Sequence, residues 1–259
     1  MRALRTAASG MLAQQLNVEV ISNNIANMNT VGFKRQRAEF QDLLYQNVER
    51  MGAQSSTQGT VVPTGIQIGA GVKAGSVYRI TQQGNMTATG GKFDLAISGR
   101  GYFQVMMPSG EIAYTRAGNL EVDGEGLLTL NGRPVLGDGG EMVLPAYRDL
   151  SFGKDGSLSI TPPGGGARLD VGRLKLVNPD PAELVKGADG LFRQRQGGDA
   201  EISEQVVLAS GFLEGANVNA VDELIGSMSL TRNFELQVKL MKTADDQARQ
   251  GARLISGQG

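Results

Sequence analysis

Few residues in this sequence have side chains suited to catalysis or cofactor binding. None of the 259 residues is His or Cys, which excludes Ser-His and Cys-His nucleophiles and the usual zinc sites. Gly69 to Ala74, GAGVKA, matches the dinucleotide pattern G-x-G-x-x-A, but that pattern requires a helix after it. The strand-like residues SVYRIT follow instead. We therefore expect a glycine-rich turn here and no cofactor.

Asp123 and Glu125 are a second candidate, because paired carboxylates can hydrolyse glycosidic bonds. They lie at the expected tip of a hairpin, where solvation removes the burial that raises the pKa of a catalytic acid. Their spacing also fails the EF-hand pattern of oxygen ligands. We expect a turn, with no catalytic residue and no metal site.

A basic run, Lys34 to Arg37, follows Phe33. The net charge of -1 and the pI near 5.7 argue against a nucleic-acid partner. A solvated helix end or an ion pair between subunits is the expected role of this run. An amphipathic N-terminus could also lie on a membrane surface, although its polar face carries Gln and Asn rather than Lys and Arg.

The N-terminal stretch has the period of a helix with one narrow apolar seam. Steps of three and four from Leu4 reach apolar residues at nearly every position. The predicted seam contains Leu4, Met11, Val18, Ile21 and Ile25.

The C-terminal stretch has the same period from Asn219 onward. Asn219 is a suitable N-cap, and acidic residues occupy the first turn while basic residues occupy the later turns, as the helix dipole favours. Its predicted seam contains Leu224, Phe234, Val238 and Met241. We expect the two terminal helices to pair as a coiled coil.

A pair with so narrow a seam is unstable alone, because ordering about 25 backbone residues costs more free energy than seven buried side chains return. One interpretation is that the ends are disordered in isolation and fold when many copies pack together. The other is an ordinary helical pair that caps one globular domain.

Between the helices, strands are expected from Val72 to about Leu208, where short β-branched or alternating runs are separated by Gly, Asp or Pro. Hairpins should turn near Asp123-Gly124 and Asp155-Gly156. The first helix should end or bend within residues 23–35, a short helix is expected over 38–46, and 46–71 is expected to be extended chain and loop. The predicted fold is α+β with a central all-β domain, a small sandwich or barrel-like structure.

The predicted organisation has three domains. They are a terminal helical domain (residues 1–36 plus 216–259), an extended linking domain (37–88 plus 197–215) and a central β domain (89–196).

Both ends of the chain resemble the bacterial flagellar axial proteins, the rod and hook proteins. SNNIANMNTVGFKR at residues 22–35 resembles their N-terminal signature, and EGANVNAVDEL at 214–224 with TRNFE at 231–235 resembles their C-terminal signature. DLAISGRGYFQV at 94–105 and YTRAG at 114–118 match their β domain. We call the following the signature residues: Asn23, Asn24, Ala26, Asn27, Thr30, Gly32, Phe33, Lys34, Asn217, Asn219, Arg232 and Glu235.

The resemblance implies a structural subunit that polymerises helically with copies of itself into a tube across the periplasm. The implied partners are proximal rod proteins, the hook protein, the surrounding L- and P-ring proteins and the flagellar type III export apparatus. Export would use the uncleaved N-terminal region, which agrees with the interruption of any signal-peptide apolar run by Gln14, Gln15 and Asn17.

Residues 33–45, 52–56 and 63–69 resemble the distal-rod branch of the family. We hypothesise that residues 46–69 wedge between neighbouring subunits and stiffen the rod; a disordered surface loop is the alternative. A proximal rod or hook protein is the other reading within the family. An enzyme or glycan-binding module acting on the cell wall is the competing reading outside it.

Overall fold

The computed structural model describes residues 2–49, 66–203 and 205–256. They form two compact units, each made of segments that are distant in the sequence. Unit 1 contains Met1–Ala26, Gln36–Ile80 and Asn219–Gly259, and unit 2 contains Asn27–Arg35 and Thr81–Val218. The fold mixes helix and strand, with a helix at each end and a β-rich centre. The three-domain division made from the sequence stays a prediction.

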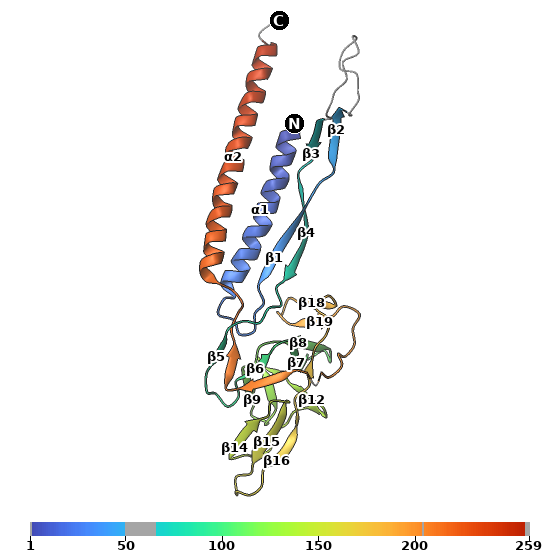
Figure 1. Cartoon of the computed structure of the whole chain (residues 1–259), viewed down its shortest axis with the longest axis vertical. Helices are drawn as coiled ribbons and strands as arrows, with labels where there is room; N and C mark the ends of the chain where they lie inside the picture. The colour runs from blue at the N-terminus through green and yellow to red at the C-terminus, as the bar shows by residue number, and fades with distance from the viewer. Residues whose placement is uncertain (1, 50–65, 204, 257–259) are drawn as a thin grey trace. The chain divides into compact units, whose positions relative to one another are not determined.

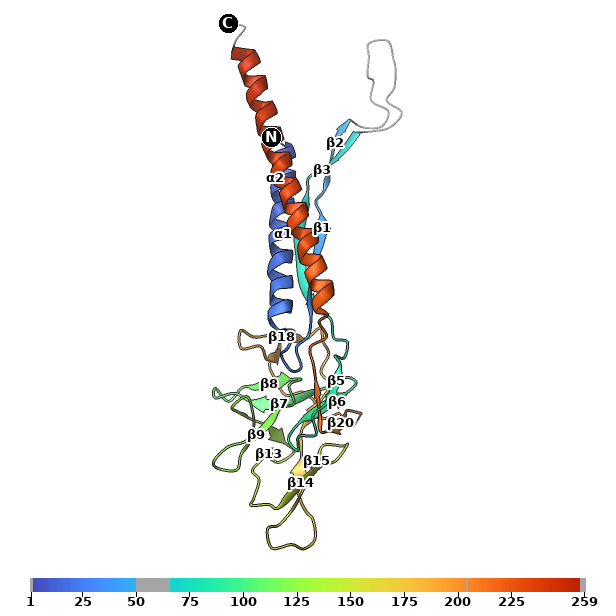
Figure 2. The same ribbon diagram turned by 90° about the vertical axis from the view of Figure 1, so that its left-hand side faces the viewer.

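Unit 1 is built from two helices and a long β ribbon that lie side by side (Figures 1 and 2). The helices are α1 (Arg2–Ala26) and α2 (Ala220–Ser256), and the strands are β1 (Gln36–Asp42), β2 (Tyr45–Glu49), β3 (Ile66–Gly69) and β4 (Val72–Arg79). β1 pairs antiparallel with β4, and β2 with β3. The short helix expected over residues 38–46 is wrong, because β1 and β2 occupy this stretch. Phe40 alternates with polar neighbours on β1, which suits a strand with one half-buried face.

Asn219 caps α2 as expected, since its side-chain Oδ1 accepts a hydrogen bond from Val221 N at 3.1 Å. α1 ends at Ala26 within the asparagine-rich stretch. None of the helices in the described residues is long and apolar enough to span a membrane.

Unit 2 consists of antiparallel strands joined by tight turns (Figure 1). Its largest sheet has the order β17-β7-β8-β19-β18, and two three-stranded sheets have the orders β14-β15-β16 and β11-β10-β9. β12 pairs with β13, β20 with β6, and β21 with β5. The bounds are β5 Met86–Ala88, β6 Leu95–Ser98, β7 Tyr102–Met106, β8 Ile112–Thr115, β9 Leu120–Val122, β10 Leu128–Leu130, β11 Arg133–Pro134, β12 Leu136–Gly137, β13 Gly140–Glu141, β14 Asp149–Phe152, β15 Ser157–Thr161, β16 Leu169–Arg173, β17 Leu176–Val177, β18 Leu184–Lys186, β19 Phe192–Gln194, β20 Val207–Ser210 and β21 Phe212–Glu214.

Both predicted hairpins are confirmed. β9 pairs with β10 across residues 123–127, and β14 pairs with β15 across residues 153–156. The main core gathers inward-facing residues of these strands, including Leu95, Phe103, Leu128, Leu158 and Leu174. A smaller cluster around Tyr102, Tyr114 and Phe192 packs the β8 and β19 side of the largest sheet.

Candidate functional site

The two terminal helices contact each other in an antiparallel arrangement. A Cβ on Gly10 would lie 3.0 Å from Gln237 Nε2, and a Cβ on Gly226 would lie 3.2 Å from Ile21 Cδ1. The contact residue thus advances by eleven positions on α1, from 10 to 21, while it falls by eleven on α2, from 237 to 226. Asn24 Nδ2 donates to Glu223 Oε2 at 3.4 Å, three positions further along each helix in the same sense. One register therefore holds along the pair.

Small and polar residues make up much of this helix pair interface. Gly10 and Gly226 bring the backbones close, and Asn24 and Glu223 are almost fully buried. The Oε1 atoms of Gln14 and Gln237 are buried and accept no hydrogen bond within the described part of the chain. Glycines contribute no side chain to bury, and buried polar atoms without a partner oppose pairing, so these residues stabilise the pair only weakly.

The predicted N-terminal seam lies only partly at this interface. Ile21 contacts α2 as described above. Leu4, Met11, Val18 and Ile25 are spaced by seven, so they form one stripe, which is rotated by roughly 60–100° from the line through Gly10, Ile21 and Asn24. Val18 is 41% exposed, and the other members of the stripe are half-buried.

The predicted C-terminal seam divides in a similar way. Val238 and Met241 are half-buried. Leu224 is 54% exposed and Phe234 is 45% exposed. Leu224 lies next to Glu223, one step around the helix from the α1 contact.

Leu224 belongs to a set of apolar side chains on α2 that face solvent, which we call the α2 outer face. Each of these side chains is more than half exposed, and their spacing places them on the side of α2 away from Glu223 and Gly226. The α2 outer face contains Val221, Leu224, Ile225, Met228 and Leu236.

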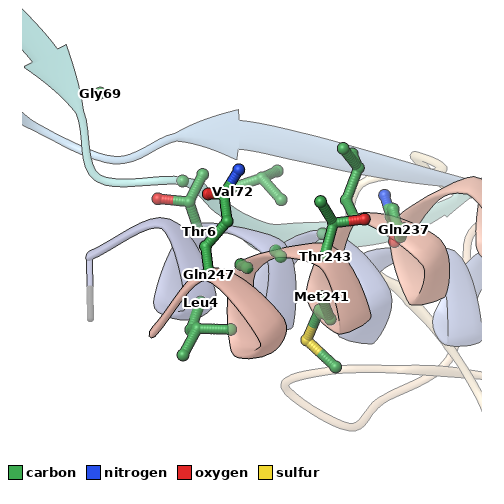
Figure 3. A pocket seen from close by; sticks show the side chains of 13 residues that line it. Leu4, Thr6, Gly69, Val72, Gln237, Met241, Thr243 and Gln247 are labelled. Atoms are coloured by element: carbon green, nitrogen blue, oxygen red, sulfur yellow. The ribbon is translucent and has the colours of Figure 1, made fainter. Parts of the chain in front are cut away.

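A groove of about 970 Å³ lies between α1, α2 and the link between β3 and β4 at Gly69, Gly71 and Val72. Figure 3 shows Leu4 and Thr6 of α1 and Met241 and Gln247 of α2 among its lining residues. Among the residues whose side chains the structure describes, the lining is mainly apolar and small and contains no Asp, Glu, Lys or Arg. It offers a packing surface without groups suited to acid–base chemistry.

In the GAGVKA motif, Gly69 ends β3 and Val72 begins β4, so the motif is a two-residue interruption of the ribbon and not the expected turn. Gly71 has φ +114°, and a Cβ there would lie 2.3 Å from Ser9 Oγ. Val72 N donates to Ser9 Oγ at 3.2 Å. The glycine lets the ribbon approach α1 closely, and strand β4 follows the motif in place of the helix that the dinucleotide pattern requires. Asp123 and Glu125 are exposed, and Asp123 Oδ1 accepts from Glu125 N and Leu127 N at 2.9 Å each, as in a turn.

Unit 2 contains a buried cluster of three charged side chains, which we call the charge cluster. Lys34 Nζ lies 2.6 Å from Glu214 Oε1, and Arg116 Nη2 lies 2.7 Å from Glu214 Oε2. Lys34 and Arg116 are 4% exposed and Glu214 is 0% exposed. The expectation of a solvated helix end or an intersubunit ion pair is therefore wrong for Lys34, which pairs within its own unit.

Hydrogen bonds satisfy the charge cluster from several segments. Lys34 Nζ also donates to Gln82 O at 2.8 Å, and Arg116 Nη1 donates to Gly99 O and Gly101 O at 2.8 Å each. Glu214 Oε1 accepts from Gly84 N at 2.8 Å. Burial lowers the pKa of the Lys34 ammonium, and the Glu214 carboxylate opposes this shift only in part.

Backbone contacts surround the charge cluster. Gly32 N donates to Glu214 O at 2.8 Å, and Arg35 N donates to Asn217 Oδ1 at 2.6 Å. Asn217 Nδ2 in turn donates to Gln82 O at 2.9 Å. Gly32 has φ +70°, and Phe33 is buried with Lys186 Nζ 4.7 Å above its ring centroid.

Within unit 1, Asn24 pairs with the backbone of β1 in both directions. Its Nδ2 donates to Gln36 O and its Oδ1 accepts from Gln36 N, each at 2.9 Å. Among the other signature residues, Thr30 N donates to Asn27 O at 3.0 Å, closing a turn. Asn23, Ala26, Arg232 and Glu235 are exposed.

Sequence reasoning did not select Glu214 or Arg116 as site residues. Each is a charged residue that directly follows a short strand-like run, LASGFL and IAYT respectively. A charge in that position is costly to bury without a partner. The presence of Lys34, Arg116 and Glu214 beside apolar runs could therefore have indicated a buried ion pair.

Comparison with known proteins places these features in a family. The model for "Flagella basal body rod protein" matches residues 4–34, that for "Flagellar hook protein FlgE/F/G D1 domain" matches 96–160, and that for "Flagellar basal body rod FlgEFG protein C-terminal" matches 209–254. The flagellar basal-body rod protein FlgG of Caulobacter vibrioides is 47% identical over 99% of this chain and 100% of that relative. The chain belongs to the flagellar basal-body rod protein family.

Two further relatives show the range of the rod protein family. FlgG of Agrobacterium fabrum is 37% identical over 96% of this chain and 97% of its own. FlgF of Escherichia coli is 32% identical, with 96% of each chain covered. Rod proteins are structural components of the flagellum, and the three matched regions contain most of α1, much of unit 2 and most of α2.

Proposed function

We propose that this rod protein is a structural subunit of the flagellar distal rod that polymerises helically into a rigid tube, the drive shaft that transmits torque across the periplasm to the hook. The identities of 47% and 37% to FlgG proteins, against 32% to a FlgF protein, favour the distal rod over another rod or hook position.

The observation that carries the polymer proposal is the α2 outer face. Five apolar side chains on the side of α2 away from α1 are each more than half exposed, and such a patch is typical of an interaction surface. The helix pair beneath them is weakly stabilised by its own interface, as its glycines and unsatisfied glutamines indicate. Packing against helices of neighbouring subunits would bury the outer face and supply the missing stabilisation.

The stripe Leu4, Met11, Val18 and Ile25 supports the same arrangement. It lies beside the α1–α2 contact, where a third helix could reach it. In this proposal the nine predicted seam residues act in coiled-coil contacts, some within the subunit and some between subunits. The proposed partners are further copies of the chain, proximal rod proteins, the hook protein, the L- and P-ring proteins and the type III export apparatus, with export from an uncleaved N-terminus.

We infer no catalytic role, because the two exposed acids lie in a turn and the glycine motif leads directly into strand β4. The proposed stiffening by residues 46–69 falls largely on residues 50–65, outside the described residues. Deletion of this segment should give rods that bend; rods as straight as before would support the surface-loop alternative.

Electron microscopy of basal bodies from cells lacking this chain tests the proposal. Truncation at the proximal rod, without a hook, is the expected result. A complete rod that ends without a hook would place the chain in the hook instead. Intact basal bodies with normal filaments would contradict a structural role and would make digestion of purified cell walls the next assay.

A further inference from the structure

The charge cluster joins segments that are far apart in the chain. Lys34 belongs to residues 27–35, which directly follow α1, and Glu214 belongs to residues 211–218, which directly precede α2. Arg116 follows β8, between these two segments in the sequence. The carboxylate of Glu214 therefore connects residues 27–35, residues 211–218 and the β strand that ends before Arg116, all within unit 2.

The balance of charge in the cluster depends on that carboxylate. Lys34 and Arg116 are both cations, and the charge of Arg116 acts against that of Lys34. Without Glu214, two cations would be buried with no opposite charge, at a cost of several kcal/mol. Residues 32–34 and 82–84 would then favour solvent over their buried positions.

Both cations precede Glu214 in the sequence, so their burial depends on a residue that comes later in the chain. Lys34 and Arg116 precede Glu214 by 180 and 98 positions, so a chain that emerges from its N-terminus presents both cations long before the carboxylate. The β14-β15-β16 sheet contains none of the three residues and does not need Glu214 to pair.

We propose that the charge cluster is a latch that closes only when the C-terminal segment arrives, so that residues 27–35 become fixed in the same step as residues 211–218. Until residues 211–218 are present, residues 27–35 stay undocked from the rest of unit 2. It acts in the single chain, so it stands independently of the proposed polymer.

Hydrogen exchange on the full-length monomer, read by peptide mass spectrometry, tests the latch. In Glu214→Gln we expect residues 27–35 and 82–84 to lose about 100-fold or more of their protection, which corresponds to the cost of an unpaired buried charge. Strands β14 to β16 should keep theirs. Lys34→Met is the matched control, because it leaves the Arg116–Glu214 pair balanced, and its protection should stay within about threefold of the wild type.

Equal protection in Glu214→Gln and the wild type would overturn the proposal, as would equal losses in Glu214→Gln and Lys34→Met. Loss of protection throughout unit 2 would show a general stabilising role and would also overturn it. Pulsed hydrogen-exchange labelling during refolding of the wild type measures when each segment becomes protected. Residues 27–35 should become protected together with residues 211–217; protection of 27–35 in an earlier phase would refute the latch.

Discussion

Single glycines determine how closely the segments around Glu214 approach one another. Gly32 adopts φ +70°, and a Cβ there would lie 2.4 Å from the carbonyl carbon of Arg116. This contact is with backbone, which cannot move aside as the end of a flexible side chain can. The glycine of the VGFK motif is thus required both by its conformation and by its surroundings.

We predict that Gly32→Ala destabilises unit 2 by about 3 kcal/mol or more, because it combines an unfavourable φ with a backbone clash. Urea unfolding of the monomer measures the change. Gly90→Ala is the matched control: Gly90 has φ +69° but no atom within 4 Å of the added Cβ, so only the conformational cost of about 1–2 kcal/mol should appear. Similar losses in the two variants would show that the contact with Arg116 is unimportant.

The ion pair between Asp189 and Arg193 makes a pH-dependent contribution to the stability of the folded protein. Its hydrogen bond with Arg193, 2.8 Å between Oδ2 and Nη2, lowers the pKa of Asp189 to about 2 from an ordinary value of 3.8. The folded state therefore favours the charged carboxylate. This stabilisation is present above about pH 3.8 and is lost as the pH falls through 2.

We predict that Asp189→Asn costs on the order of 1 kcal/mol at pH 7, because the pair is partly exposed and solvent screens it. At pH 2 the cost should be smaller, since the wild-type carboxylate is then partly protonated. Unfolding midpoints at both pH values provide the measurement. A difference between the two proteins that is independent of pH would contradict this account.

Among the elements, α1 and β1 are joined by one side chain that acts as a backbone substitute. Asn24 makes two hydrogen bonds to Gln36, in the pattern of two paired strand residues, and is 1% exposed. An amide is the side chain that offers a donor and an acceptor in this geometry.

We predict that Asn24→Ala weakens the attachment of β1 to α1 and costs about 1–3 kcal/mol in unit 1, because the N–H and C=O of Gln36 lose their partners. Hydrogen exchange at β1 and β4 should increase. Ser22→Ala, at an exposed position in the same turn of α1, should leave exchange unchanged. Equal exchange in the two variants would show that Asn24 does not join the elements.

The whole molecule combines a well-packed β core in unit 2 with a helix pair in unit 1 that exposes apolar side chains. Stability and assembly are therefore expected to depend on different residues. Substitutions on the α2 outer face should affect association between copies and leave unit 2 folded.

We predict that Val18→Glu and Ile225→Glu abolish polymerisation, because each places a charge in an apolar contact between subunits. Sedimentation and electron microscopy of the purified chain measure assembly, and far-UV circular dichroism reports the β structure, which should be unchanged. Lys242→Glu, an exposed charge change on α2, is the control and should assemble more readily than either variant. Normal rods from Ile225→Glu would remove the α2 outer face from the assembly surface.

Sequence patterns alone predict the mixed helix and strand fold, the cap of α2 at Asn219 and the hairpins at residues 123–127 and 153–156. These features follow from local periodicity and turn chemistry, which act over a few residues. Local patterns also indicated β structure from Val72 onward. They misassigned residues 38–46, where pairing with β4 decides in favour of a strand.

Long-range packing sets which face of each helix meets the other and which charges are buried together. Periodicity identifies an apolar stripe but not its neighbour, so the rotation of the α1–α2 contact away from Leu4, Met11, Val18 and Ile25 was not predictable. Lys34, Arg116 and Glu214 are separated by 82 and 98 positions, and no local pattern connects them. Their partnership exists because the folded backbone brings three costly charges to one buried place, where each is tolerated only in the presence of the others.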